Sequence, residues 1–175
     1  MAKTAVKEKT SDASKSTGLL IKRIQIKDNR AIISYHDDKD FSLNEGTHTG
    51  KDDCTSEFLQ IFDSAKEIFG EIIQGLRKEL PTISMNVIKF EYNNQGFLDK
   101  VLMSVKYKFN KQGNVTNIST GNIPIYNDNL GENVVCISGK HVDLLHEIIQ
   151  KAKDYMKGDT RTKQMKLVVD NTEEK

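Results

Sequence analysis

The sequence has little of several residue types on which whole protein classes depend. Its 175 residues include no Trp, two Pro and two Cys. No apolar run approaches the roughly 18 residues that a membrane-spanning helix needs, and residues 1–17 lack the apolar stretch of a secretory signal. We therefore expect a cytoplasmic protein with no membrane partner, in which Cys54 and Cys136 are reduced thiols. Collagenous, disulfide-stapled and membrane-spanning classes are excluded.

A large net charge is absent as well. The chain carries 26 Lys and Arg against 25 Asp and Glu, a formal charge of +1. No overall field therefore attracts nucleic acid or an anionic surface, and any cationic site must arise from a local arrangement. Charge is unevenly distributed along the chain, because residues 37–57 hold seven carboxylates and two lysines.

Recognisable catalytic, nucleotide-binding and metal-binding motifs are missing too. Ser138-Gly139-Lys140 lacks the first glycine of a phosphate-binding loop. Eight side chains of metal-binding types crowd one stretch: His36, Asp37, Asp38, Asp40, His48, Asp52, Asp53 and Cys54. Their spacing fits neither a zinc finger nor an EF-hand. We predict no enzymatic activity, no metal and no cofactor; a solvated acidic loop is the preferred interpretation of residues 36–54, and a divalent-cation site is the alternative.

What is present is the patterning of one globular domain. Residues 1–17 are rich in Lys and poor in apolar side chains, which predicts a disordered basic tail. Residues 18–158 have the length and periodicity of a single α+β domain. Residues 159–175 form a C-terminal segment in which Lys166–Val169 is predicted to add a short edge strand before a frayed end.

Period-two patterns predict the strands. Residues 19–27 and 31–35 form a hairpin around the turn residues Asp28-Asn29, and a polar loop is expected over 36–53. Three further strands, at 83–92, 97–109 and 115–126, form a meander with Pro124 at a sheet edge.

Apolar residues spaced by threes and fours predict two helices. The first covers residues 55–80, with Thr55 as its N-cap and Pro81 enforcing its end. The second covers 139–157 and ends at Gly158. The order of a strand pair, a helix, three strands and a helix predicts the α+β class with an antiparallel sheet. A faint likeness between the two helices makes a pseudo-repeat of hairpin-plus-helix units an alternative description.

The strands alternate lysines with apolar residues, and this pattern carries the functional hypothesis. The side chains predicted to hold nucleic acid on an outward sheet face are Arg23, Lys27, Lys89, Lys100, Lys106, Lys108 and Tyr92. Cations track a phosphate backbone and aromatic rings stack on bases. We therefore expect a non-enzymatic accessory protein that binds single-stranded DNA or RNA. Solvated lysines that only discourage aggregation are the simpler interpretation. A protein-interaction, inhibitor or assembly subunit, including a homo-oligomer, is the alternative function.

Overall fold

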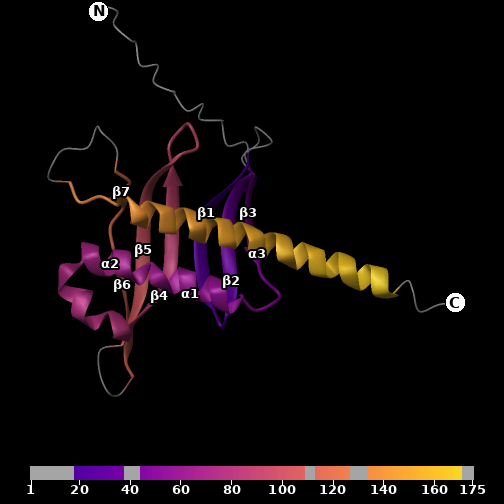
Figure 1. Cartoon of the computed structure of the whole chain (residues 1–175), viewed down its shortest axis with the longest axis horizontal. Helices are drawn as coiled ribbons and strands as arrows, with labels where there is room; N and C mark the ends of the chain where they lie inside the picture. Colours follow the sequence, from indigo (N-terminus) through magenta and orange to yellow (C-terminus); the bar gives the residue numbers. More distant parts are fainter. Residues whose placement is uncertain (1–17, 38–43, 109–112, 127–133, 171–175) are drawn as a thin grey trace, which may run out of the picture.

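A computed structural model describes residues 18–37, 44–108, 113–126 and 134–170. Its seven strands form one sheet, and its helices lie on one face of that sheet (Figure 1). The strands are β1 (Leu19–Lys27), β2 (Arg30–Asp37), β3 (Asn44–Thr49), β4 (Ile83–Tyr92), β5 (Leu98–Lys108), β6 (Val115–Ser119) and β7 (Ile123–Pro124). The helices are α1 (Ser56–Ser64), α2 (Lys66–Ile72), the 3-10 helix η1 (Gln74–Thr82) and α3 (Lys140–Asp170).

Every strand pair in the sheet is antiparallel, which confirms the predicted α+β class. The strand order is β3-β2-β1-β4-β5-β6, and β7 pairs with the other end of β5. The first half of the chain runs as three strands followed by helix, and the second half as four strands followed by helix. The helical parts differ, however, because the first is broken into three pieces and the second is continuous over 31 residues. The pseudo-repeat therefore stays a prediction.

The β1–β2 hairpin forms where the sequence predicts it. Asp28 and Asn29 have φ values of 51° and 61°, which is the left-handed backbone of a two-residue hairpin turn. The turn fixes the register, so that Lys27 lies opposite Arg30 and Ile24 opposite Ile33.

Strand β3 corrects the prediction of a polar loop over residues 36–53. Its six residues pair with β2, from Asp37 opposite Asn44 to Ile32 opposite Thr49. The sequence hides this strand because Gly46 within it and Gly50 directly after it resemble turn signals. A Cβ on Gly46 would overlap the ring of Tyr35 and one on Gly50 the ring of Tyr155, so both glycines admit close aromatic contacts. Residues 38–43 lie outside the described part of the chain.

The prediction of one continuous helix over residues 55–80 is also wrong. Thr55 does cap α1, since its Oγ1 accepts a hydrogen bond from the Phe58 backbone N–H at 3.2 Å. The helix then breaks after Ser64 and again at Ile73, whose φ and ψ are −101° and 78°. Segment η1 folds back on α2, where the Leu80 Cδ2 lies 2.8 Å from the position of a Cβ on Gly70. The apolar residues spaced by threes and fours therefore belong to short helical segments that pack against each other, and not to one continuous helix.

The second meander has the predicted order with an interrupted last strand. Residues 115–126 were expected to form one strand, but β6 ends at Ser119 and β7 begins at Ile123. Thr120 causes the interruption, because its side-chain Oγ1 accepts the Met103 N–H at 3.0 Å while its own N–H donates to the Met103 carbonyl.

Helix α3 is longer than predicted and corrects the C-terminal assignment. Gly158 does not stop it, and Lys166–Val169 belongs to the helix instead of an edge strand. The left-handed glycine that limits this helix is at its start, where Gly139 has a φ of 52°. The last part of α3 extends past the sheet (Figure 1). Within the described residues no helix is long and apolar enough to cross a bilayer.

One hydrophobic core lies between the sheet and the helices. Its fully buried side chains include Ile24 of β1, Ile88 of β4 and Met103 of β5, packed beneath Phe58 of α1 and Leu145 of α3. Burial of each such side chain stabilises the fold by about 1.5–3 kcal/mol. The core fixes which face of every strand points toward the helices.

Candidate nucleic-acid interface

The sheet face opposite the helices, which we call the open face, is defined by strand alternation. Ile24, Ile88 and Met103 point into the core and are fully buried. Successive side chains in a strand point to opposite faces, so their neighbours Gln25 and Lys89 point away from the helices.

All six cations predicted from the sequence lie on this open face. Cross-strand partners share a face, and Arg23 of β1 is opposite Lys89 of β4. Lys89 is in turn opposite Leu102 of β5. Stepping by two along the same strands from these residues reaches the remaining predicted cations: Lys27, Lys100, Lys106 and Lys108. The five lysines are exposed and Arg23 is half-buried.

The register arranges the open face in rows that cross the strands. A neutral row runs through six mutually opposed residues: Thr49, Ile32, Gln25, Val87, Ser104 and Ser119. A cationic row lies on each side of the neutral row, two residues away along the strands. One contains Arg30, Lys27 and Lys106, and the other contains Arg23 and Lys89. Two residues of strand span roughly 7 Å. The uncharged row is therefore about 7 Å from cations on both sides.

The neutral row has an apolar centre that is separate from the main core. Val87 is only 7% exposed, yet it does not belong to the core cluster beneath the helices. Ile32, on the other side of Gln25 in the same row, and Leu102 in the next row are half-buried. The partly exposed apolar surface of the open face therefore comes from Ile32 and Leu102, whereas Val87 is almost completely covered.

Arg23 and Gln25 form a polar contact on the open face. The Arg23 Nη2 donates to the Gln25 Oε1 at 2.8 Å. The Arg23 Nε is buried and has no hydrogen-bond partner among the described residues. Arg23 thus contributes a charge to the face and also holds the neighbouring amide in one orientation.

Acidic residues on the open face are few. Glu91 lies opposite Lys100 and accepts a hydrogen bond from the Asn122 Nδ2 at 2.9 Å. Arg30 forms an exposed ion pair with Asp53 at 3.4 Å, so its charge is partly neutralised.

Tyr92, the one aromatic residue predicted at the interface, is held against the fold. Its hydroxyl donates to the Ile21 carbonyl at 2.9 Å, and its ring packs against the core. Burial raises the pKa of the Tyr92 hydroxyl well above its usual value, and the hydrogen bond to Ile21 offsets only part of that shift. The Lys22 Nζ lies 5.4 Å from the ring centroid, a cation–π distance. Tyr92 therefore supports β1 and is not free to stack on a base.

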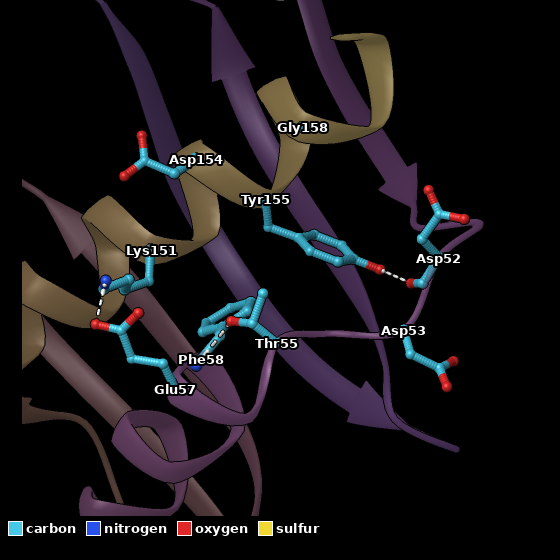
Figure 2. Close-up of a pocket in the computed structure, with 9 residues that line it drawn as sticks. All are labelled: Asp52, Asp53, Thr55, Glu57, Phe58, Lys151, Asp154, Tyr155 and Gly158. Carbon is cyan, nitrogen blue, oxygen red and sulfur yellow. Dashed lines mark hydrogen bonds and ion pairs between the residues drawn. The ribbon is translucent and has the colours of Figure 1, made fainter. Parts of the chain in front are cut away.

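A pocket on the helical side has the opposite charge (Figure 2). It has a volume of about 380 Å³ and lies between α3, the start of α1 and the loop before α1. Its lining includes four carboxylates and one ammonium group, from Asp52, Asp53, Glu57, Asp154 and Lys151. We call it the acidic pocket.

Two contacts from α3 hold the acidic pocket together. The Tyr155 hydroxyl donates to the Asp52 carbonyl at 2.5 Å, and the Lys151 Nζ pairs with the Glu57 Oε1 at 2.6 Å (Figure 2). The hydrogen bond to Glu57 raises the pKa of Lys151. The lining has three more carboxylates than ammonium groups, and Asp53 and Asp154 also pair with Arg30 and Lys157 at its rim.

The metal alternative for residues 36–54 gains no support from the described residues. No group of three or more His, Cys, Asp or Glu side chains in that part of the chain is arranged to hold a metal ion. Asp38 and Asp40 lie outside it.

Sequence reasoning missed the neutral row and Arg30. The signal for Arg30 was present, because a two-residue turn at Asp28-Asn29 places Arg30 opposite Lys27. The neutral row depends on the pairing of β1 with β4, two strands more than 50 residues apart in the chain. A comparison with protein-family models, curated proteins and solved structures found no match in any of the three.

Proposed function

We propose that this protein binds single-stranded nucleic acid on the open face without covalent chemistry. The observation that carries the proposal is the register, by which six cations from β1, β4 and β5 share the face opposite the helices. A chain with a net charge of +1 thereby presents a locally cationic surface.

The binding mechanism is counterion release combined with contact to the bases. Lysines in the cationic rows replace the counterions of the phosphates, and bases rest on the neutral row beside Ile32. An open sheet gives unstacked bases a surface, whereas base readout from a duplex needs an element that enters a groove. A single strand is therefore the expected ligand.

The charge count predicts how binding depends on salt. For single strands the slope of log K against log salt is about −0.7 per phosphate contact. With roughly four phosphate contacts, raising salt from about 50 to about 200 mM lowers the affinity roughly 50-fold.

Charge reversal at two lysines tests the proposal. Lys89 and Lys106 are exposed on either side of the neutral row, and the double variant K89E/K106E is expected to bind a labelled oligothymidylate at least tenfold more weakly. The matched control is K78E/K140E, which makes the same change in net charge at exposed positions of η1 and α3. Fluorescence anisotropy at low and moderate salt measures both.

Two results oppose the proposal. Absence of binding by the unmodified protein at micromolar concentration removes it, and equal losses in the two double variants show that only net charge matters. A stable oligomer in light scattering that is indifferent to oligonucleotides favours a protein-interaction or assembly subunit instead.

A further inference from the structure

Phe97 lies at one end of the open face, directly before β5. Its side chain is 47% exposed, whereas the other phenylalanines that the structure describes are buried in the core. Burial in the core is the arrangement that stabilises a fold through this residue type. Two features of the β4–β5 hairpin, a bulge and a turn, keep the Phe97 ring outside the core instead.

The bulge turns the Phe97 side chain away from the core. Along β5, Val101 and Met103 point into the core, and simple alternation would place Phe97 with them. The pairing of β5 with β4 skips Asp99, however, and thereby shifts by one residue. As a result Leu98 packs against the core, and its neighbour Phe97 points to the open face. Bulges re-aim side chains in this way and are common beside functional sites.

The turn before Phe97 is held by Asn93. The Asn93 Oδ1 accepts hydrogen bonds from the backbone N–H groups of Gln95 at 2.9 Å and of Phe97 at 3.0 Å. The Asn93 N–H donates to the Phe97 carbonyl at 2.9 Å. Gly96 has a φ of 83°, the left-handed backbone that this turn requires. These bonds use only backbone atoms and the Asn93 side chain, so the Phe97 ring can be replaced without loosening the hairpin.

The open face offers a ligand an aromatic ring at Phe97 and not a charge. Lys89 lies in one of the two cationic rows, and the end of the hairpin that carries Phe97 is four residues further along the chain, roughly 13 Å away. The lysine between them, Lys100, is flanked by two carboxylates, with Asp99 at 3.9 Å and Glu91 opposite it. A nucleic-acid strand whose phosphates are held at Lys89 therefore meets the Phe97 ring beyond its last phosphate contact.

We propose that Phe97 stacks on a base of the nucleic acid bound to the open face. This inference rests on the proposed function and adds the aromatic contact that Tyr92 cannot make. Every base has a π face, so stacking on one ring tolerates any sequence. It needs a base that is not already stacked within a duplex, and the ring therefore favours a single strand.

Replacement of the ring tests the inference. F97A and F97L are each expected to bind oligothymidylate about five- to tenfold more weakly than the unmodified protein, toward the lower end of the range for alanine substitution of base-stacking residues. F97L keeps an apolar side chain without a π system, so it separates stacking from hydrophobic contact. The salt slope should stay unchanged in both variants, because no phosphate contact is lost.

A tryptophan at the same position reports the contact directly, because the chain has no Trp. F97W places the single indole of the protein at the proposed stacking position. Saturating oligothymidylate should quench its fluorescence, and the affinity should be at least that of the unmodified protein. The matched control is Q150W, which places the indole at an exposed position of α3, on the other side of the sheet. The emission of Q150W should change little.

The outcomes separate this inference from the function on which it rests. If F97A or F97L binds as tightly as the unmodified protein, or if saturating oligothymidylate leaves the F97W emission unchanged, the inference is wrong. It is also wrong if F97A instead abolishes an oligomer in light scattering, because the ring is then a protein contact. In each case the proposed function still stands, provided that binding is salt-dependent and lost in K89E/K106E. If the unmodified protein binds no oligonucleotide, both are wrong.

Discussion

The open face and the acidic pocket carry charges of opposite sign and are built in different ways. On the open face, cations come from strands, and their positions follow from the register of β1, β4 and β5. In the acidic pocket, carboxylates come from a loop and two helices, and side chains of α3 hold them together. The near-zero net charge of the chain therefore conceals two regions of opposite local charge, which meet at the ion pair of Arg30 with Asp53.

The two regions also differ in how their charges are paired. Glu57 and Asp53 of the acidic pocket have cationic partners, Lys151 and Arg30. On the open face, Lys106 and Lys108 are two residues apart along β5. The neutral row separates these two lysines from the cations on its other side. Paired charges stabilise a local structure, whereas like charges held in rows are available to an external polyanion.

Gly50→Ala is expected to give the largest effect on stability and to break the acidic pocket alone. A Cβ at residue 50 overlaps the Tyr155 ring, which must swing away and give up its hydrogen bond to Asp52 and its contact with Phe58. Such overpacking costs about 1–3 kcal/mol of unfolding free energy. Urea denaturation followed by circular dichroism measures this loss.

A double variant checks the cause of that loss. With Tyr155→Leu in place there is no ring to displace, so adding Gly50→Ala should then be nearly neutral. A full loss in both backgrounds contradicts the proposed contact. Oligonucleotide binding by folded Gly50→Ala protein should stay unchanged, because the open face lies on the other side of the sheet.

Tyr92→Phe is expected to have a smaller effect and to test the support beneath the open face. The variant loses the hydrogen bond to the Ile21 carbonyl, which lowers the unfolding free energy by about 1 kcal/mol. The raised pKa of Tyr92 sets the pH dependence. The neutral hydroxyl is favoured in the folded protein, so this contribution is complete below the ordinary tyrosine pKa of about 10 and is lost as pH rises above it.

The measurement for Tyr92 is the difference in stability between the two proteins across alkaline pH. The gap between the unmodified protein and Tyr92→Phe should shrink as pH rises above about 10. A gap that is constant with pH contradicts the buried hydroxyl. Binding of oligothymidylate by Tyr92→Phe at neutral pH should match that of the unmodified protein, whereas a large loss restores Tyr92 as a stacking residue.

Local patterns in the sequence predict the antiparallel class and much of the open face. The positions of Lys106 and Lys108 between more buried residues follow from the two-residue period of a strand. The turn at Asp28-Asn29 follows from the identity of those two residues. Long-range packing determines the features that were missed. Strand β3 depends on aromatic rings of β2 and α3 that cover Gly46 within it and Gly50 directly after it. The break in residues 55–80 depends on Leu80 returning to Gly70.

The features of the candidate site also divide into those that local sequence patterns predict and those that depend on long-range packing. Its cations could be named from the sequence because each lies in a segment whose local pattern predicts a strand. Tyr92 could not be judged correctly, since its role depends on a carbonyl of β1 that is 71 residues away. The neutral row and the Arg23–Gln25 contact needed the β1–β4 register and the observed side-chain geometry.

Glu57→Gln is expected to give the smallest effect and to sharpen the separation of the two surfaces. Removing this carboxylate breaks the exposed pair with Lys151, and exposed pairs contribute little to stability. At physiological salt, exposed charges act over about 8 Å, and the sheet and its core separate Glu57 from the open face. Affinity for oligothymidylate, measured by anisotropy at about 150 mM salt, should therefore change less than twofold, with a larger rise as salt is lowered and screening weakens. A severalfold rise that persists at physiological salt means that the acidic pocket opposes binding directly, so that the nucleic acid reaches the helical side and the two surfaces act together.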